Sequence, residues 1–193
     1  MSASAHVTLE PGRVYRTRDL YIWGRNPSRL ARRLVEQHEL VQLAQGLYLH
    51  PEKSSLGNVP AEDRELVRVF LGDDDFVFTG SEQWNALGLG STAVFTKPII
   101  YNHKRSGEFR LGKRKFVFRR VSFPSQPTPE WFVVDLFEHA DMAGVSREEL
   151  AEGLVAAVHA KKLDVTRLRE MAARYSTAKN RSTIESAIEM ALP

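Results

Sequence analysis

Residues 26–50, NPSRLARRLVEQHELVQLAQGLYLH, carry the main signals for the fold of the N-terminal part of this chain. Asn26 followed by Pro27 is typical of a helix start, because Asn caps free backbone N–H groups and Pro fits the first helical position. At 100° per residue, the apolar side chains of residues 27–38, with His38, fall on one face and the arginines fall on the opposite one. The apolar segments on either side of the turn at residues 44–46 then predict a β-hairpin.

A turn, a short strand and a short helix precede this basic helix. Pro11-Gly12 is a turn signal, and the next four residues alternate polar and apolar side chains as a short strand does. Thr17 or Asp19 is suited to cap a short helix that follows. A short helix, a turn, a basic helix and a hairpin follow one another in a winged helix-turn-helix. We therefore predict such a DNA-binding domain for residues 1–53, with residues 1–10 as a short helix or a loose arm.

The rest of the chain predicts a second domain over residues 60–193. A polar stretch rich in Ser, Gly and Pro, residues 54–60, separates the two as a linker. The fold class is thus α+β: a winged helix-turn-helix, then an α/β domain with a basic antiparallel hairpin and C-terminal helices. We expect helices over 61–71, 81–87, 130–142, 147–160, 165–175 and 179–190, and strands over 76–78, 97–101, 109–111 and 115–121.

Charge is unevenly distributed along the 193 residues, whose formal net charge is +3. Residues 97–120 hold nine Lys or Arg and one acidic residue, a net charge of +8, and residues 1–50 hold seven Arg and four acidic residues, a net charge of +3. Segregated positive charge favours a polyanionic partner. The chain has no cysteine, no apolar stretch long enough to span a bilayer and no secretory signal pattern, so we expect a cytoplasmic protein.

The sequence does not predict a catalytic site. Gly107 to Lys113 imitates a phosphate-binding loop, but Arg114 replaces the Ser or Thr that would hold Mg²⁺, and a strand pattern follows where a helix is needed. Residues 73–75 are three consecutive aspartates, which we interpret as an acidic turn. The six histidines lack chelating spacings. We expect a protein that is not an enzyme and that needs neither metal nor cofactor.

Double-stranded DNA is the predicted partner, because an α-helix fits the major groove and arginine binds guanine or phosphate there. The predicted contacts lie on the outer face of the basic helix, in the turn before it and at the hairpin tip: Arg25, Ser28, Arg29, Arg32, Arg33 and Gln45. A secondary basic surface comprises Lys104, Arg105, Lys113, Lys115 and Arg119. This second surface could extend the DNA contact, bind RNA or dock an acidic protein.

Several motifs together resemble the AbiEi-type antitoxin family of type IV toxin–antitoxin, abortive-infection loci. In the N-terminal part they are Gly12-Arg-Val-Tyr15, Thr17-x-Asp19-Leu20, Arg29-x-x-Arg32-x-Leu34-Val35 and Leu43-Ala-Gln-Gly46-Leu-Tyr48. Further along they are Phe78-Thr-Gly80-Ser81, Ala86-Leu-Gly88-Leu89, Val134-Asp135-Leu136 and Leu163-Asp164-x-x-x-Leu168. The family generally has a full helix before the Gly-x-Val-Tyr strand, where this chain offers about ten residues.

The resemblance implies a DNA-binding autorepressor that binds inverted repeats in its own promoter. It further implies that the second domain counteracts a nucleotidyltransferase-like toxin without forming a stable complex with it. Two alternatives remain. One is an RNA-binding or toxin-docking module that uses residues 97–120, and the other is a metal-dependent nucleotide-processing enzyme built on Asp73 to Asp75, or on Asp135 and Glu138.

Overall fold

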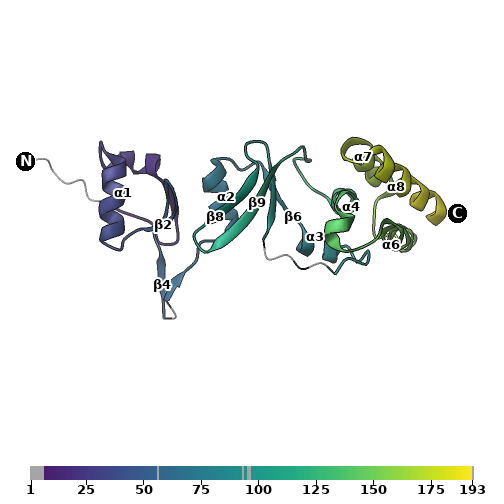
Figure 1. Ribbon diagram of the computed structural model, residues 1–193, viewed down its shortest axis with the longest axis horizontal. Coiled ribbons are helices and arrows are strands. Elements are labelled where there is room, and N and C mark those ends of the chain that lie inside the picture. Colours follow the sequence, from purple (N-terminus) through teal and green to yellow (C-terminus); the bar gives the residue numbers. More distant parts are fainter. Residues whose placement is uncertain (1–6, 56, 93, 95–96, 193) are drawn as a thin grey trace, which may run out of the picture. The chain divides into compact units, whose positions relative to one another are not determined.

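The computed structural model describes residues 7–55, 57–92, 94 and 97–192, and it shows a mixed α+β protein (Figure 1). The chain forms two compact units. Unit 1 comprises the described residues of Met1–Asp74 and Glu108–Phe116, and unit 2 comprises those of Asp75–Gly107 and Val117–Pro193. Part of the expected N-terminal helix or arm, residues 1–6, lies outside the described residues.

Unit 1 begins with a three-stranded antiparallel sheet of strand order β1-β3-β2. A 3₁₀ helix and an α-helix connect its first two strands. The elements are β1 (Val14–Arg16), η1 (Thr17–Trp23), α1 (Pro27–Glu36), β2 (Val41–Ala44) and β3 (Leu47–Leu49). The predicted basic helix and hairpin are confirmed. The helix is two residues shorter than expected, because His38 takes a left-handed backbone conformation with φ 58° and is exposed, off the apolar face.

The apolar face of α1 holds this part of unit 1 together. Leu30, Ala31 and Leu34 are buried and cluster with Tyr15 of β1 and with Leu20 and Leu40. Ala31 and Leu20 have no exposed surface. Burying a leucine side chain stabilises a fold by about 1.5–3 kcal/mol, so this face fixes how α1 is rotated and turns the opposite face outward.

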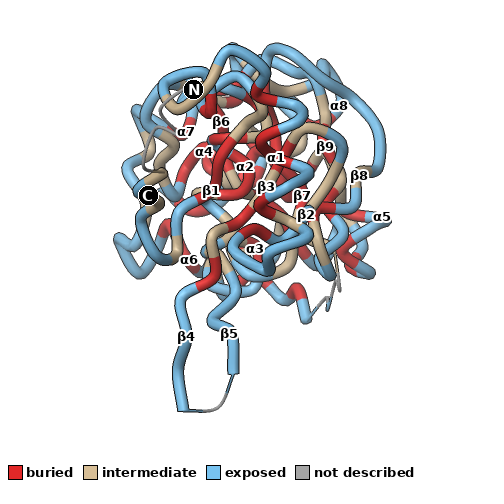
Figure 2. Tube along the Cα trace, turned by 90° about the vertical axis from the view of Figure 1, so that its left-hand side faces the viewer, coloured by how far each residue is buried: buried red, intermediate tan, exposed pale blue. Residues whose placement is uncertain are grey.

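The linker predicted over residues 54–60 is wrong, because residues 52–54 and 57–59 form a β-hairpin. Strands β4 (Glu52–Ser54) and β5 (Gly57–Val59) pair as an antiparallel hairpin, and every described residue of the two strands is exposed (Figure 2). Three-residue strands without a buried face have no apolar alternation, so the pattern of the sequence did not indicate them. Helix α2 (Asp63–Leu71) follows and ends at Gly72 in the left-handed region.

A four-stranded sheet of order β6-β7-β9-β8 follows. Its strands are β6 (Phe76–Thr79), β7 (Ile99–Asn102), β8 (Gly107–Leu111) and β9 (Arg114–Arg120). β7 pairs antiparallel with β6 and parallel with β9. The two residues Gly112 and Lys113 join β8 to β9, and a connection this short is possible only between antiparallel strands. Residues 107–113, which resemble a phosphate-binding loop in sequence, therefore form strand β8 and a hairpin turn.

Helices form most of the remainder of unit 2. They are α3 (Ser81–Ala86), α4 (Pro129–Glu138), α5 (Ala140–Ala143), α6 (Arg147–His159), α7 (Val165–Tyr175) and α8 (Ala178–Ala191). The single helix expected over residues 130–142 is wrong, because the backbone leaves the helical region at His139 (φ −122°, ψ 22°). The predicted capping box of Ser146 and Glu149 is confirmed.

The core of unit 2 lies among these helices. Trp84 of α3 and Phe137 of α4 are fully buried, as are Leu150 and Leu154 of α6 and Ile184 of α8. Within the part of the chain that the structure describes, no helix has both the length and the apolar composition needed to cross a membrane.

Candidate nucleic-acid interface

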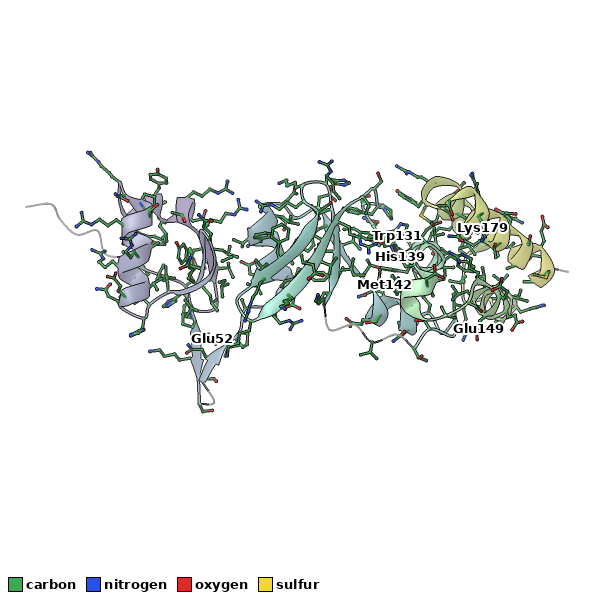
Figure 3. The ribbon with its side chains drawn as sticks, viewed as in Figure 1. Glu52, Trp131, His139, Met142, Glu149 and Lys179 are labelled. Carbon is green, nitrogen blue, oxygen red and sulfur yellow. The ribbon has the colours of Figure 1, made fainter. Side chains whose placement is uncertain are left out.

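The outer face of α1 is positively charged and exposed. Ser28, Arg29, Arg32 and Arg33 are all exposed and lie opposite the buried residues of the same helix. Side chains that end in nitrogen extend from α1 in Figure 3. An α-helix presenting a basic face can enter the major groove of B-DNA.

These arginines do not stabilise the helix by pairing with acidic side chains. Among the described residues, Arg25, Arg29, Arg32 and Arg33 have no carboxylate within ion-pair distance. Arg29 stands three residues before Arg32 and four before Arg33, and like charges at such spacings destabilise a helix by about 0.2–0.5 kcal/mol per pair. The cluster thus opposes helix formation slightly, and helix stability does not account for it.

Local structure fixes the N-terminal end of this face. The side chain of Asn26 accepts a hydrogen bond from the backbone N–H of Arg29 at 3.0 Å, as predicted, and Pro27 occupies the first helical turn. Arg25 lies exposed in the bend just before the cap. The N-terminal turn of α1 is therefore held by its cap rather than frayed.

The β2–β3 turn lies close to the start of η1. Gly46 has φ +72°, a conformation that glycine adopts without strain, and its carbonyl accepts a hydrogen bond from the backbone N–H of Thr17 at 3.0 Å. Gln45 at this turn is exposed. All six predicted contact residues are therefore accessible and belong to unit 1.

The predicted secondary basic surface is divided between the two units. Lys113 and Lys115 are exposed in unit 1, whereas Lys104, Arg105 and Arg119 belong to unit 2. The backbone N–H groups of Lys104 and Arg105 both donate to the side chain of Asn102, so this loop is ordered by a buried amide. Arg119 is half-buried, with Nη1 2.9 Å from Nε2 of His139.

A second group of arginines in unit 1 was missed from the sequence. A polar hollow of about 320 Å³ is lined by Arg13, Arg16, Arg18 and Arg68, with acidic residues between them. Arg16 donates to the carbonyls of Val69 (2.6 Å) and Phe70 (2.5 Å) at the C-terminus of α2, where a cation is favourable. Its role is structural.

Carboxylates hold two of the other arginines of this hollow. Hydrogen bonds from Arg13 to Glu10 and from Arg68 to Glu65, both within 2.8 Å, raise the pKa of each guanidinium above its ordinary value. With these pairs made and with Asp19, Asp73 and Asp74 also lining it, the hollow offers an anion much less free positive charge than α1 does.

Unit 2 contains a buried polar cluster around Asp135. Oδ2 of this carboxylate accepts hydrogen bonds from Thr79 and from Nε1 of Trp84, at 2.8 Å for Trp84, and Oδ1 accepts one from the Tyr101 hydroxyl at 2.7 Å. The ring of His139, labelled in Figure 3, stacks on Trp84 and places Nδ1 2.8 Å from the backbone carbonyl of Asp135. These contacts join β6, β7 and α3 to α4.

The hydrogen bonds of this cluster determine its titration. Burial alone would raise the pKa of Asp135, but hydrogen bonds from His139, Thr79 and Tyr101 outweigh burial and lower the pKa below its ordinary value. Burial and the charge of Arg119 would lower the pKa of His139. The neighbouring Asp135 carboxylate outweighs both and raises this pKa above its ordinary value. Asp135 thus remains ionised with its oxygens engaged by donors.

The acidic residues considered for an enzymatic site do not converge. Asp135 is engaged as above, and Glu138 accepts hydrogen bonds from Ser176 and Thr177. Asp73 to Asp75 lie between α2 and β6, as the expected acidic turn. Among the residues described, there is no group of three His, Cys, Asp or Glu side chains arranged to hold a metal ion.

The region of the chain that contains α1 matches a known protein family. Residues 21–128, more than half of the chain, match the model of DUF6088, described as a family of unknown function. The chain belongs to the DUF6088 family. The DUF6088 match includes α1, the β2–β3 hairpin and β6 to β9, and it ends before α4. No curated protein matches the chain.

Proposed function

We propose that unit 1 of this DUF6088 protein is a winged helix-turn-helix module that binds double-stranded DNA. The order β1, η1, α1, β2, β3 and the sheet order β1-β3-β2 support this proposal, with η1 and α1 as the helix pair and the β2–β3 hairpin as the wing. The observation that carries it is the exposed basic face of α1, whose arginines have no acidic partner among the described residues.

In the proposed complex, α1 lies in the major groove. Ser28 and Arg29 are nearest the capped N-terminus of α1 and contact base edges, since the N-terminal residues of a recognition helix read the bases. Arg32, Arg33 and Arg25 bind phosphates, and Gln45 contacts the backbone or the minor groove beside the site. Phosphate contacts supply most of the affinity and make it dependent on salt.

The proposal extends to an autorepressor and antitoxin. This part rests on the resemblance to the AbiEi-type family stated above. The operator would be an inverted repeat in the promoter of the protein's own gene, and the function of unit 2 would be to counteract a nucleotidyltransferase-like toxin without a stable complex. An inverted repeat requires two copies of α1, either in a dimer or in two monomers bound side by side.

Binding of the full chain to DNA tests the proposal. Fluorescence anisotropy is measured over a salt series with a labelled duplex from the region upstream of the coding sequence and with a random duplex of equal length. Replacing both Arg29 and Arg32 by Ala is expected to weaken binding to the promoter duplex. A lost base contact costs about 1–3 kcal/mol, and a lost phosphate contact lowers the salt slope by about one.

The matched control replaces two exposed cations of another helix. Lys179 (labelled in Figure 3) and Arg181 lie on α8 and are exposed, so Lys179→Ala with Arg181→Ala removes the same charge without touching α1. We expect this variant to bind as the unaltered protein does. Equal binding by the α1 variant and the unaltered protein would show that α1 is not the recognition helix.

A further inference from the structure

The β8–β9 turn belongs to the same compact unit as α1 and the β2–β3 hairpin. Residues Glu108–Phe116 are part of unit 1, although the strands on either side continue into unit 2. The turn carries a local excess of positive charge, with Arg110, Lys113, Arg114 and Lys115 against Glu108. Its position relative to β2 is fixed by direct contacts.

The first contact joins the turn to the edge of β2 that has no other strand. The backbone N–H of Gly112 donates to the carbonyl of Leu43 at 2.7 Å, and β2 is an outer strand in the order β1-β3-β2. Gly112 has φ +63°, and a Cβ at this position would lie 3.0 Å from Cδ2 of Leu43. Glycine is favoured here by the left-handed backbone conformation, and a Cβ would also require the end of the Leu43 side chain to shift slightly.

Two contacts with α2 also hold the β8–β9 hairpin. Arg114 forms an ion pair with Asp63 at 2.5 Å, and the ring of Phe109 lies 5.0 Å from that of Phe70. Because Asp63 neutralises Arg114, the remaining exposed cations are Arg110, Lys113 and Lys115. Neither lysine ammonium group pairs with a carboxylate in the part of the chain that is described.

The docked turn lies near the tip of the proposed wing. Leu43 and Gln45 are two residues apart, which is at most about 7 Å along the chain, less than the roughly 12 Å width of the major groove. A duplex whose backbone passes Gln45 is therefore within reach of the long side chains of Lys113 and Lys115. The charge of these lysines matches phosphate, which any sequence offers.

We infer that the β8–β9 turn is a second phosphate-binding element of unit 1, beside the wing, and that Lys113 and Lys115 bind the backbone of the duplex that α1 reads. This inference rests on the proposed function. It separates the turn from Lys104, Arg105 and Arg119 of unit 2, which the sequence had grouped with it.

The test replaces Lys113 and Lys115 by Gln in the full chain. Both residues are exposed, so the fold is retained, which circular dichroism checks. The control, Lys161→Gln with Lys162→Gln, removes two exposed lysines of unit 2. Each phosphate contact contributes about 0.9 to the slope of log K against log salt, so the Lys113 and Lys115 variant is expected to lose about 1.8 from the slope. Its affinity should fall equally for promoter and random duplexes, while the control keeps both values.

Three outcomes distinguish this inference from the proposed function. In the first outcome, the Lys113 and Lys115 variant keeps the slope of log K against log salt of the unaltered protein, while the Arg29 and Arg32 variant loses its salt-dependent binding. This outcome overturns the inference and leaves the proposed function standing. A loss confined to the promoter duplex also overturns it, because phosphate contacts do not discriminate between sequences. Absence of DNA binding by the unaltered protein overturns both.

Discussion

At the scale of single residues, Asp135 lies at the centre of a buried polar cluster in unit 2. The residue is 5% exposed, and its carboxylate accepts hydrogen bonds from Thr79, Trp84 and Tyr101, three side chains from separate elements. A buried charge is tolerated only when it is paired and hydrogen-bonded, and removing its partners is strongly destabilising. The cluster therefore acts as a structural centre for unit 2.

The pKa of Asp135 predicts a loss of stability in acid. Its value in the folded protein is below that of the unfolded chain, about 3.9, so the stability it contributes is full above that pH and is lost as the pH falls through the folded pKa. Replacing Asp135 by Asn is expected to cost about 1–3 kcal/mol at pH 7, because a buried donor of the cluster loses its charged acceptor. In urea denaturation the difference between the two proteins should shrink from pH 6 to pH 2. A difference that stays constant would show that this carboxylate does not titrate with folding.

At the scale of elements, α1 combines a stabilising face with a destabilising one. Its buried leucines anchor the helix, while its neighbouring arginines repel one another. The Asn26 cap compensates at the end where the base contacts are proposed. The element thus depends on its cap and core to present the charges.

Removing this cap should weaken both folding and DNA binding. Asn26→Ala is expected to lower the unfolding free energy by about 1 kcal/mol, because the N–H of Arg29 loses its acceptor. Thermal denaturation followed by circular dichroism measures the change. Asn26→Ser retains a capping oxygen and is the control that should lose less than Asn26→Ala. Equal losses in the two variants would mean that Asn26 contributes something other than its cap.

At the scale of the whole molecule, the net charge resides in one unit. Unit 1 contains 14 Lys or Arg against 11 Asp or Glu, a net charge of +3, and unit 2 contains 13 of each, a net charge of zero. The excess positive charge of the molecule therefore belongs to the unit that bears α1 and the β8–β9 turn. Each unit also has an apolar cluster of its own.

Because each unit has its own apolar cluster, a cavity made in unit 2 is expected to destabilise mainly unit 2. Leu150→Ala empties a fully buried position of α6 and should lower the stability of its unit by about 2–5 kcal/mol. Hydrogen exchange measured by mass spectrometry should increase in α4, α6 and α8 and remain unchanged in β1, α1, β2 and β3. An equal increase in both sets would mean that the units unfold as one.

Local signals in the sequence were sufficient to predict several elements. A cap, an apolar stripe and a turn lie within a few residues of one another, so α1, the β2–β3 hairpin, α7 and the Ser146 capping box could be predicted. The outward direction of the arginines followed from helical periodicity alone. The break at His139 and the short β4–β5 hairpin carry weaker local signals and were missed.

Contacts between residues far apart in the sequence could be identified only from the folded structure. The parallel pairing of β7 with β9, the buried donors around Asp135 and the docking of Gly112 on Leu43 join positions that lie 18 to 69 residues apart, and such contacts depend on how whole elements pack. For the same reason the basic stretch 97–120, continuous in the sequence, is divided between two units in space. Hydrophobic periodicity in the sequence indicates on which face of an element a residue lies. The packing of the elements determines which residues contact that face.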